Sequence, residues 1–330
     1  MYTPKANTAD INTSKAAAAK TNACSKNAVE LNHLTKSYGK SRGIIDINLA
    51  IQEGEFFGFI GPNGAGKSTT IHILLGLLGA DSGSASIFGK DIASKDKETL
   101  LSQTGYLPAE AVFYPGMRVR DVIRLSADLR KTDCSRNAQV LCERLTLDTS
   151  KKVEELSFGN RKKVGIVCAL QHNPRLCILD EPTSGLDPFM QREFFAILKE
   201  LHAKGTTIFL SSHILSEIQR YCTRAAIIRE GRITACDSVG ALARTNAKKV
   251  HIQLAHHCTD IADLTLDGIR DLQRTDHDIS FLYSGDMNLL LHFLAAHPIQ
   301  DLSVAEPDLE EIFMHYYLDT GSKDSADSHR

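Results

Sequence analysis

Nine consecutive residues near the start of the chain have the types and spacing of a loop that binds phosphate groups. The first eight fit the pattern G-x-x-x-x-G-K-[ST], in which glycines let backbone N–H groups close around phosphate oxygens. A helix that follows such a loop directs its positive N-terminal end at the same oxygens. We expect Lys67 to reach the β- and γ-phosphates of a nucleotide and Ser68 to ligate Mg²⁺. The candidate loop comprises Gly61, Pro62, Asn63, Gly64, Ala65, Gly66, Lys67, Ser68 and Thr69.

Two adjacent carboxylates, Asp180 and Glu181, follow the apolar run LCIL at residues 176–179. Acids that end a buried strand lie at the carboxyl edge of a parallel sheet, where open α/β folds bind their ligands. We expect Asp180 to hold Mg²⁺, directly or through water, and Glu181 to polarise the water that attacks the γ-phosphate. Such a pair is common as a strand cap, but next to a phosphate-binding loop it indicates nucleotide hydrolysis.

The residues around these motifs predict the elements that position them. Residues 56–60 (FFGFI) are almost continuously apolar, as in a strand covered on both faces, and the loop follows them. Apolar side chains then recur at helical spacing at Ile71, Leu74, Leu75 and Leu78. Ahead of this unit, an alternation of period two predicts a half-buried strand with Ile45, Ile47, Leu49 and Ile51 on one face. Strand, glycine-rich loop and helix are the first unit of a phosphate-binding α/β domain.

Further along, the pattern predicts a helical region and then a second lobe. Helices are expected over 119–130 and 137–145 and at the apolar stripe of Val164, Val167 and Cys168. Strands return at 176–179 and 207–210, each followed by a helix. After residue 243, strands near 250–254 and 279–283 and a helix over 309–317 predict a small α+β lobe.

The overall charge of −2 conceals a contrast between two parts of the chain. Residues 246–330 carry six Lys/Arg and 15 Asp/Glu, whereas residues 1–245 have a net charge of +7. An acidic lobe is a poor partner for phosphate backbones or anionic lipid, and the near-neutral total argues against a basic nucleic-acid binder. Hydrophobic residues make up 42% of the chain, enough for sizeable cores.

Other features exclude several classes of protein. No run of 18 apolar residues predicts a membrane-spanning helix. The eight cysteines include no C-x-x-C pair, which is typical of a reducing compartment rather than a disulfide or zinc framework. Residues 1–27, rich in Ala, Asn, Thr and Lys, predict a flexible tail without the apolar core of a secretory signal. Adjacent His256, His257 and Cys258 with Asp260 lack the spacing of zinc ligand pairs, so we predict no metal there.

Taken in order, these motifs resemble the ATP-binding subunit of an ABC transporter over roughly residues 29–235. Many P-loop enzymes share the loop and the carboxylate pair, but only ABC proteins join them to a signature before the carboxylate strand, a D-loop and a histidine at this distance. The final EPDLEEIF is similar to the end of subunits that energise ABC-2-type exporters, among them bacitracin- and multidrug-resistance-like pumps. The motifs are Tyr38, residues 61–68, LSFGN at 156–160, residues 176–181, SGLD at 184–187, and His213.

The resemblance implies roles for five further residues. Tyr38 would stack on adenine. Ser157 and Gly159 match the signature residues that contact the γ-phosphate bound by the opposite subunit, at the start of a helix expected near Arg161. His213 would hydrogen-bond the γ-phosphate and link Glu181 to the attacking water, and Asp187 would cross the dimer interface.

Two motifs depart from the family pattern. The signature usually reads LSGGQ, and this chain has Phe158 and Asn160 in place of Gly and Gln. The Q-loop has Ala109 where a glutamine would reach the metal. Glu110 could take over that role if the loop shifts; otherwise Ser68 and Asp180 alone hold Mg²⁺.

The fold class that the resemblance implies is α/β, a P-loop NTPase of ABC type, with a mixed sheet, flanking helices and a helical subdomain, followed by the C-terminal α+β lobe. We expect a tail at 1–27, the ATP-binding cassette at 28–244 with the helical subdomain over about 111–172, and an accessory domain at 245–330.

The implied activity is ATP hydrolysis coupled to transport by a head-to-tail dimer, either a homodimer or a heterodimer. It would power a separate transmembrane permease, for export, from the cytoplasmic face of the plasma (inner) membrane. Within the region that docks the permease, the apolar turn of Val112, Phe113, Tyr114 and Met117 is a candidate contact surface. No nucleic acid is expected as a partner.

Two other classes of function compete with transport. A soluble ABC ATPase that acts on nucleic acid or ribosomes usually has two cassettes or a cassette split by a long coiled coil, and this chain has one uninterrupted cassette. A sensor that binds nucleotide without turnover would be favoured by the absence of Glu181, which is present.

Overall fold

The computed structural model describes residues 26–39, 41–95, 97–242, 247–254, 266–275 and 278–305. The predicted tail up to residue 25, the histidine–cysteine cluster at 256–260 and the predicted helix over 309–317 lie outside these residues. Within the described ranges, no helix combines the length and the hydropathy needed to cross a membrane.

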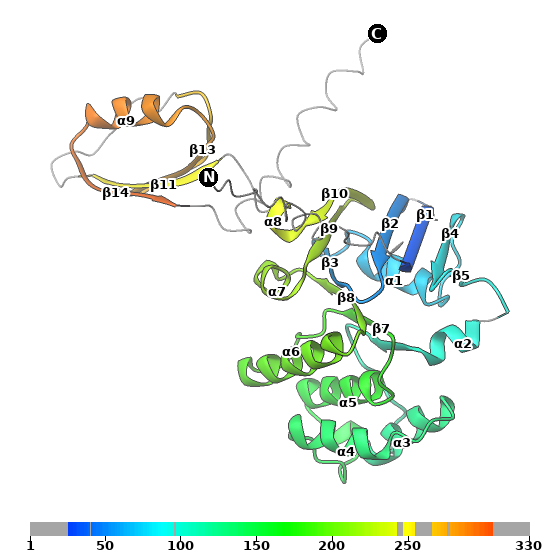
Figure 1. Cartoon of the computed structure of the whole chain (residues 1–330). Helices are drawn as coiled ribbons and strands as arrows, with labels where there is room; N and C mark the ends of the chain where they lie inside the picture. The colour runs from blue at the N-terminus through cyan, green and yellow to red at the C-terminus, as the bar shows by residue number, and fades with distance from the viewer. Residues whose placement is uncertain are drawn as a thin grey trace, which may run out of the picture.

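A six-stranded sheet forms the centre of the larger lobe (Figure 1). Five of its strands, β9, β3, β8, β7 and β6, run parallel to one another, and the sixth, β10, pairs antiparallel with β9. In sheet order the strands are β10 (Arg232–Ser238), β9 (Arg224–Arg229), β3 (Phe56–Ile60), β8 (Thr207–Ser212), β7 (Leu176–Asp180) and β6 (Thr104–Leu107).

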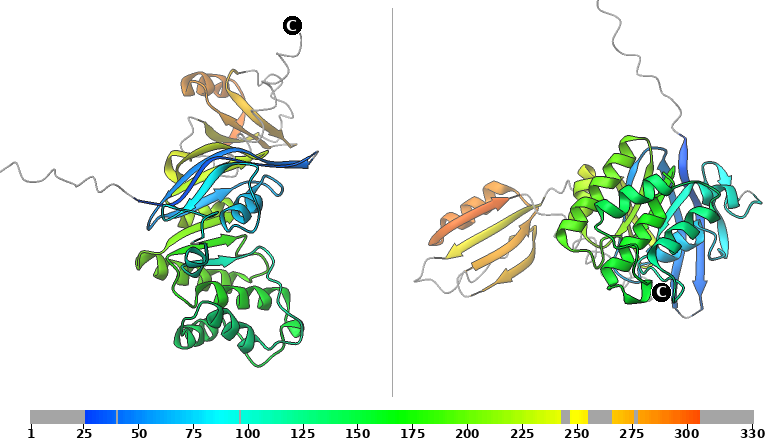
Figure 2. Two further views of the ribbon diagram at one scale, coloured as in Figure 1. Left: turned by 90° about the vertical axis from the view of Figure 1, so that its right-hand side faces the viewer. Right: turned by 90° about the horizontal axis from the view of Figure 1, so that it is seen from below.

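Strands β3, β7 and β8 are buried on both faces of this sheet, which explains their continuous apolar runs. On one face, Phe56, Leu179 and Leu210 pack in a core with the helices that follow the strands. On the other, Phe57 and Phe209 pack in a core shared with α1 (Lys67–Leu74) and a second sheet. The six-stranded sheet therefore lies between helices and the second sheet (Figure 2).

The second sheet is antiparallel, in the order β2 (Ser41–Gln52), β1 (Asn27–Tyr38), β4 (Ser82–Ile87) and β5 (Lys90–Asp91). The prediction that Ile45 lies on the buried face of this strand is wrong. The register between β1 and β2 shifts in this region, Asp46 has a φ of 55°, and Ile44 is buried while Ile45 is 42% exposed. A β-bulge thus exchanges the faces of the residues that precede it.

Helices cover the remaining face of the six-stranded sheet and extend away from it. The predicted helices at 119–130 and 137–145 are α3 (Val119–Leu129) and α4 (Ser135–Arg144), and both contact α5 (Phe158–Leu170). The other elements of this lobe are α2 (Lys97–Ser102), the short 3-10 helix at Val153–Glu155, α6 (Pro188–Ala203), α7 (Leu215–Tyr221) and α8 (Val239–Leu242).

The described part of the C-terminal region forms a small α+β unit with a core of its own. Its antiparallel sheet has the order β12 (Ile269–Arg274), β13 (Asp278–Tyr283), β11 (Lys248–Leu254) and β14 (Ile299–Ala305). Helix α9 (Met287–Ala295) packs on the sheet through Leu290 and Leu294.

Candidate functional site

Three parallel strands bring the predicted motifs to one edge of the central sheet. Strand β3 ends at the glycine-rich loop, β7 ends at Asp180 and β8 ends at Ser212. The register places Asp180 beside Ser211 and Ile60 beside Ser212, so the three carboxyl ends are level. This is the edge at which open α/β sheets bind ligands.

The glycine-rich loop needs its glycines because of the backbone conformation that closes it. Gly64 and Gly66 have φ values of 80° and 110°, a region that side chains with a Cβ rarely adopt. Gly66 is the N-cap of α1, so the helix begins at Lys67 directly after the turn. Residues 62–64 are exposed, and the loop presents its backbone and the positive end of α1 to solvent.

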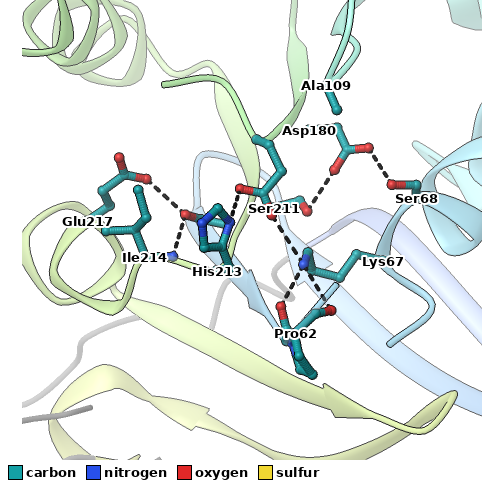
Figure 3. A network of polar contacts seen from close by, with 12 residues as sticks. Pro62, Lys67, Ser68, Ala109, Asp180, Ser211, His213, Ile214 and Glu217 are labelled. Carbon is teal, nitrogen blue, oxygen red and sulfur yellow. Dashed lines mark hydrogen bonds and ion pairs between the residues drawn. The ribbon is translucent and has the colours of Figure 1, made fainter. Parts of the chain in front are cut away.

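The Lys67 side chain folds back over this loop and is only 5% exposed. Its Nζ donates to the Pro62 carbonyl at 3.3 Å (Figure 3). It also donates to the Gly61 carbonyl at 2.5 Å and lies 3.2 Å from Oε1 of Glu181. The ammonium thus lies between the loop and the Glu181 carboxylate, which directly follows β7. A phosphate group bound in the loop would meet a cation that is already in place.

Ser68 and Asp180 form the part of the site that suits a divalent cation. The Ser68 hydroxyl donates to Oδ2 of Asp180 at 2.7 Å, and the Ser211 hydroxyl donates to Oδ1 at 2.9 Å. Asp180 is 2% exposed, whereas Ser68 is exposed. A hydroxyl and a carboxylate are the hard oxygen donors that Mg²⁺ prefers, so these residues fit the ion.

Glu181 is held in an unusual backbone conformation beside Lys67. Its φ is 45°, and its N–H donates to the Ser211 carbonyl at 3.0 Å. Residues other than glycine adopt a positive φ only at a cost in free energy. Such backbone strain is maintained where the surrounding contacts fix the residue. Oε2 lies 2.7 Å from Nδ1 of His213, while the buried Oε1 accepts no hydrogen bond within the described residues.

A third carboxyl group, Glu217 on α7, was not predicted from the sequence. It is 7% exposed and accepts a hydrogen bond from the Ser212 hydroxyl at 2.9 Å, and burial raises its pKa. Ser212 in turn accepts from the N–H of Ile214. These contacts fix the segment that carries His213 (Figure 3). The signal in the sequence was a polar SSH segment after an apolar strand, followed by an acid on the next helix.

The signature residues lie at the N-terminus of α5, which begins three residues before the predicted start near Arg161. Ser157 is the N-cap and accepts from the N–H of Asn160 at 3.3 Å. A Cβ on Gly159 would lie 2.4 Å from the Gly185 carbonyl, and one on Gly185 would meet the Phe158 ring. The two glycines therefore let the signature pack directly against the segment before Asp187.

Asp187 and Tyr38 make contacts that the sequence did not predict. Asp187 is the N-cap of α6 and accepts from the N–H groups of Phe189 and Met190. Tyr38, at the end of β1, is 46% exposed, with the Lys36 ammonium 6.0 Å from its ring centroid. An exposed ring of this kind is free to stack on a planar group.

The loop after β6 brings Ala109 to the edge of the sheet at which β3, β7 and β8 end. Figure 3 shows Ala109 beside Asp180 there. Glu110 is exposed, and within the described residues it makes no hydrogen bond to Ser68 or Asp180. The side chain that does reach this loop is Lys162 of α5, whose Nζ donates to the carbonyls of Pro108 and Ala109. Burial lowers the pKa of Lys162 to about 8.

The apolar turn that follows this loop divides between the core and the surface. Phe113 and Met117 pack partly against the core beneath the helices, whereas Val112 is 83% and Tyr114 75% exposed. Phe113 and Met117 are thus only partly exposed, and the side chains of Val112 and Tyr114 form most of the exposed part of the predicted contact surface.

Comparisons with known proteins agree with this geometry. A family model described as ABC transporter matches residues 44–184. The chain is 36% identical to the bacitracin transport ATP-binding protein of Bacillus licheniformis over 233 residues, 69% of this chain and 75% of that protein. It is 30% identical to the linearmycin resistance ATP-binding protein of Bacillus subtilis, over 87% of this chain and 97% of that protein.

A solved structure of the ATP-binding subunit of an ABC transporter superimposes with a TM-score of 0.62 and 33% identity. It covers 66% of this chain and 92% of the solved chain. The similarity in structure therefore covers about two thirds of the chain, and the similarity in sequence to the linearmycin relative covers 87% of it.

Proposed function

Since the chain belongs to the ABC transporter family as an ATP-binding and ATP-hydrolysing subunit, we propose that its reaction takes place at the edge formed by β3, β7 and β8, with Glu181 as the base. The observation that carries this proposal is the convergence there of the glycine-rich loop, the Ser68–Asp180 pair and the Glu181–His213 pair.

Glu181 has the surroundings of a general base. One carboxylate oxygen is engaged by His213, and the other is buried and accepts no hydrogen bond within the described residues. A water molecule that donates to this second oxygen would be oriented by it and would lose its proton to it. Lys67, 3.2 Å from the same oxygen, would hold the phosphate side of the reaction.

Mg²⁺ would be held by Ser68 and Asp180, and when bound it would neutralise charge on the β- and γ-phosphate oxygens. Ser211 fixes the second oxygen of Asp180, so the carboxylate has one orientation available to the ion. Glu110 remains a candidate for a further ligand through a shift of its loop. Tyr38 would stack on the adenine ring, and the loop from Gly61 to Thr69 would surround the phosphates.

We further propose that two copies, or this chain and a related one, form the complete site. Ser157 and Gly159 lie at the N-terminus of a 13-residue helix and would act on the nucleotide of the other subunit. Asp187 would lie at the interface as the cap of α6. The cassette would extend over residues 28–244, with the helical subdomain over about 111–172 and the accessory unit over 245–330.

The transport partner would be a separate transmembrane permease on whose cytoplasmic side the chain docks. The exposed side chains of Val112 and Tyr114 support a contact surface on the turn before α3. The two bacterial relatives are named for bacitracin transport and linearmycin resistance, which supports export as the direction.

The function is tested by phosphate release from ATP by the purified chain, measured with Mg²⁺ and after chelation of Mg²⁺. We expect turnover that requires the ion and a shift from monomer to dimer mass with a non-hydrolysable ATP analogue. Turnover unchanged by chelation would contradict the assignment of Ser68 and Asp180. A monomer at saturating analogue would contradict the shared site.

A further inference from the structure

Lys162 is a buried cation that contacts no carboxylate in the part of the chain that the structure describes. It is 1% exposed, and its Nζ lies 2.9 Å from the Pro108 carbonyl, 2.8 Å from the Ala109 carbonyl and 3.5 Å from the Asp180 carbonyl. A lysine ammonium has three N–H donors, and three backbone carbonyls surround this one. Every donor is therefore directed at the main chain.

An arrangement of this kind is costly to build for stability alone. A buried charge pays a desolvation penalty that carbonyl dipoles return only in part, and an apolar side chain at this position would avoid it. The position lies four residues before buried Ile166 on the same face of α5, where an apolar residue would fit the helix pattern. The lysine is thus placed where the core would accept a hydrophobic residue.

The three carbonyls belong to two different segments of the candidate site. Pro108 and Ala109 lie in the loop after β6, and Asp180 ends β7. Lys162 itself lies on α5, the helix whose N-terminus carries Ser157 and Gly159. One side chain therefore joins the signature helix, the loop that carries Ala109 and the strand end that carries the metal-binding carboxylate.

We propose that Lys162 is a positioning residue for ATP hydrolysis. Its ammonium holds the Pro108–Ala109 backbone against the end of β7. The loop therefore stays beside the proposed Mg²⁺ ligands Ser68 and Asp180, although position 109 has no side chain that could bind the ion. Because the anchor is on α5, a displacement of the signature helix is passed to the loop and to Asp180 together. This inference rests on the proposed function of the Asp180–Glu181 edge.

The test compares Lys162→Met with Lys163→Met. The first change keeps a long, unbranched side chain but removes the charge and the N–H donors. Lys163 is the next residue of α5 and is partly exposed, so it is a matched control. We measure kcat, the KM for ATP, and the Mg²⁺ concentration for half-maximal rate. Hydrogen exchange of the backbone amides at 107–112 is measured on the same proteins.

Lys162→Met should lower kcat at least about tenfold and raise the half-maximal Mg²⁺ concentration, while the KM for ATP stays within about threefold. The amides at 107–112 should exchange faster, since the loop has lost its anchor. Lys162→Arg, which retains a charge and N–H donors, should recover part of kcat. Lys163→Met should match the wild type in every measurement.

A folded Lys162→Met protein with wild-type kcat, Mg²⁺ dependence and exchange would overturn the proposal, as would a loss of thermal stability with kcat per folded molecule unchanged. If Lys162→Met does not fold, Lys162→Gln decides, because it keeps two N–H donors but no charge: reduced kcat with faster exchange supports the anchor, and wild-type values overturn it. The proposed function is judged separately, since its failure would remove ATP turnover from the wild type.

Discussion

Nδ1 of His213 lies 2.7 Å from Oε2 of Glu181, although 32 positions separate the two residues in the chain. Because an ionised carboxylate only accepts hydrogen bonds, we assign a proton to Nδ1 in this pair. The contact leaves Nε2 of the half-exposed ring unengaged by Glu181, and the other carboxylate oxygen lies 3.2 Å from Nζ of Lys67. The segments that follow β7 and β8 thus form one unit, in which His213 would orient Glu181 as the proposed base.

Lys67→Ala should weaken ATP binding by about 10- to 100-fold, because a buried charge-assisted contact to the phosphates is lost. The change also removes the cation 3.2 Å from Oε1 of Glu181. Calorimetric titration with ATP and Mg²⁺ measures the effect. Unchanged affinity would remove Lys67 from the site.

The loop after β6 offers a direct comparison between Glu110→Ala and Ala109→Gln. If Glu110 moves to the metal, Glu110→Ala should raise the Mg²⁺ concentration for half-maximal ATPase rate more than Ala109→Gln does. The measurement is a Mg²⁺ titration of phosphate release. Equal and negligible effects would mean that neither side chain at this loop contacts the ion.

Val112→Asp together with Tyr114→Ser should abolish co-purification with a co-expressed membrane subunit and leave basal ATPase activity within about threefold. Both side chains are exposed, so the change should not disturb the core. Leu77→Ser, at another exposed apolar residue, is the matched control and should co-purify normally. Retained co-purification of the double variant would place the docking surface elsewhere.

His172 should make thermal stability depend on pH. Burial, with a smaller effect of the Arg130 guanidinium, lowers its pKa from 6.5 to about 4 in the folded chain. The unfolded chain therefore binds a proton on His172 at a higher pH than the folded chain does. The contribution of neutral His172 to the free energy of unfolding is complete above pH 6.5 and is lost as the pH falls toward 4. Melting temperatures across this range should fall less steeply for His172→Phe than for the wild type, and parallel curves would contradict the linkage.

The strands and loops of the candidate site could be predicted because each is marked by neighbouring residues in the sequence. Residues 56–60, 176–179 and 207–210 are continuous apolar runs, and the motifs follow them directly. Periodicity alone could not reveal the bulge at Ile45 and Asp46, since a shift of register depends on the partner strand. The start of α5 at Phe158 was missed because the cap is a single serine.

Lys162 shows a different limit of sequence reasoning. Its place on the buried face of α5, four residues before Ile166, was a readable signal, but charged residues at such positions usually extend to solvent. Its three acceptors are backbone carbonyls, which no residue type marks. Only the folded chain brings them together.

The most direct test of the central claim is single-turnover hydrolysis of ATP by Glu181→Gln. The amide keeps the shape of the side chain but cannot accept a proton, so hydrolysis should slow by at least about 10²-fold while ATP still binds. The protein should then accumulate as an ATP-bound dimer. Hydrolysis at close to the wild-type rate would contradict the assignment of Glu181 as the base.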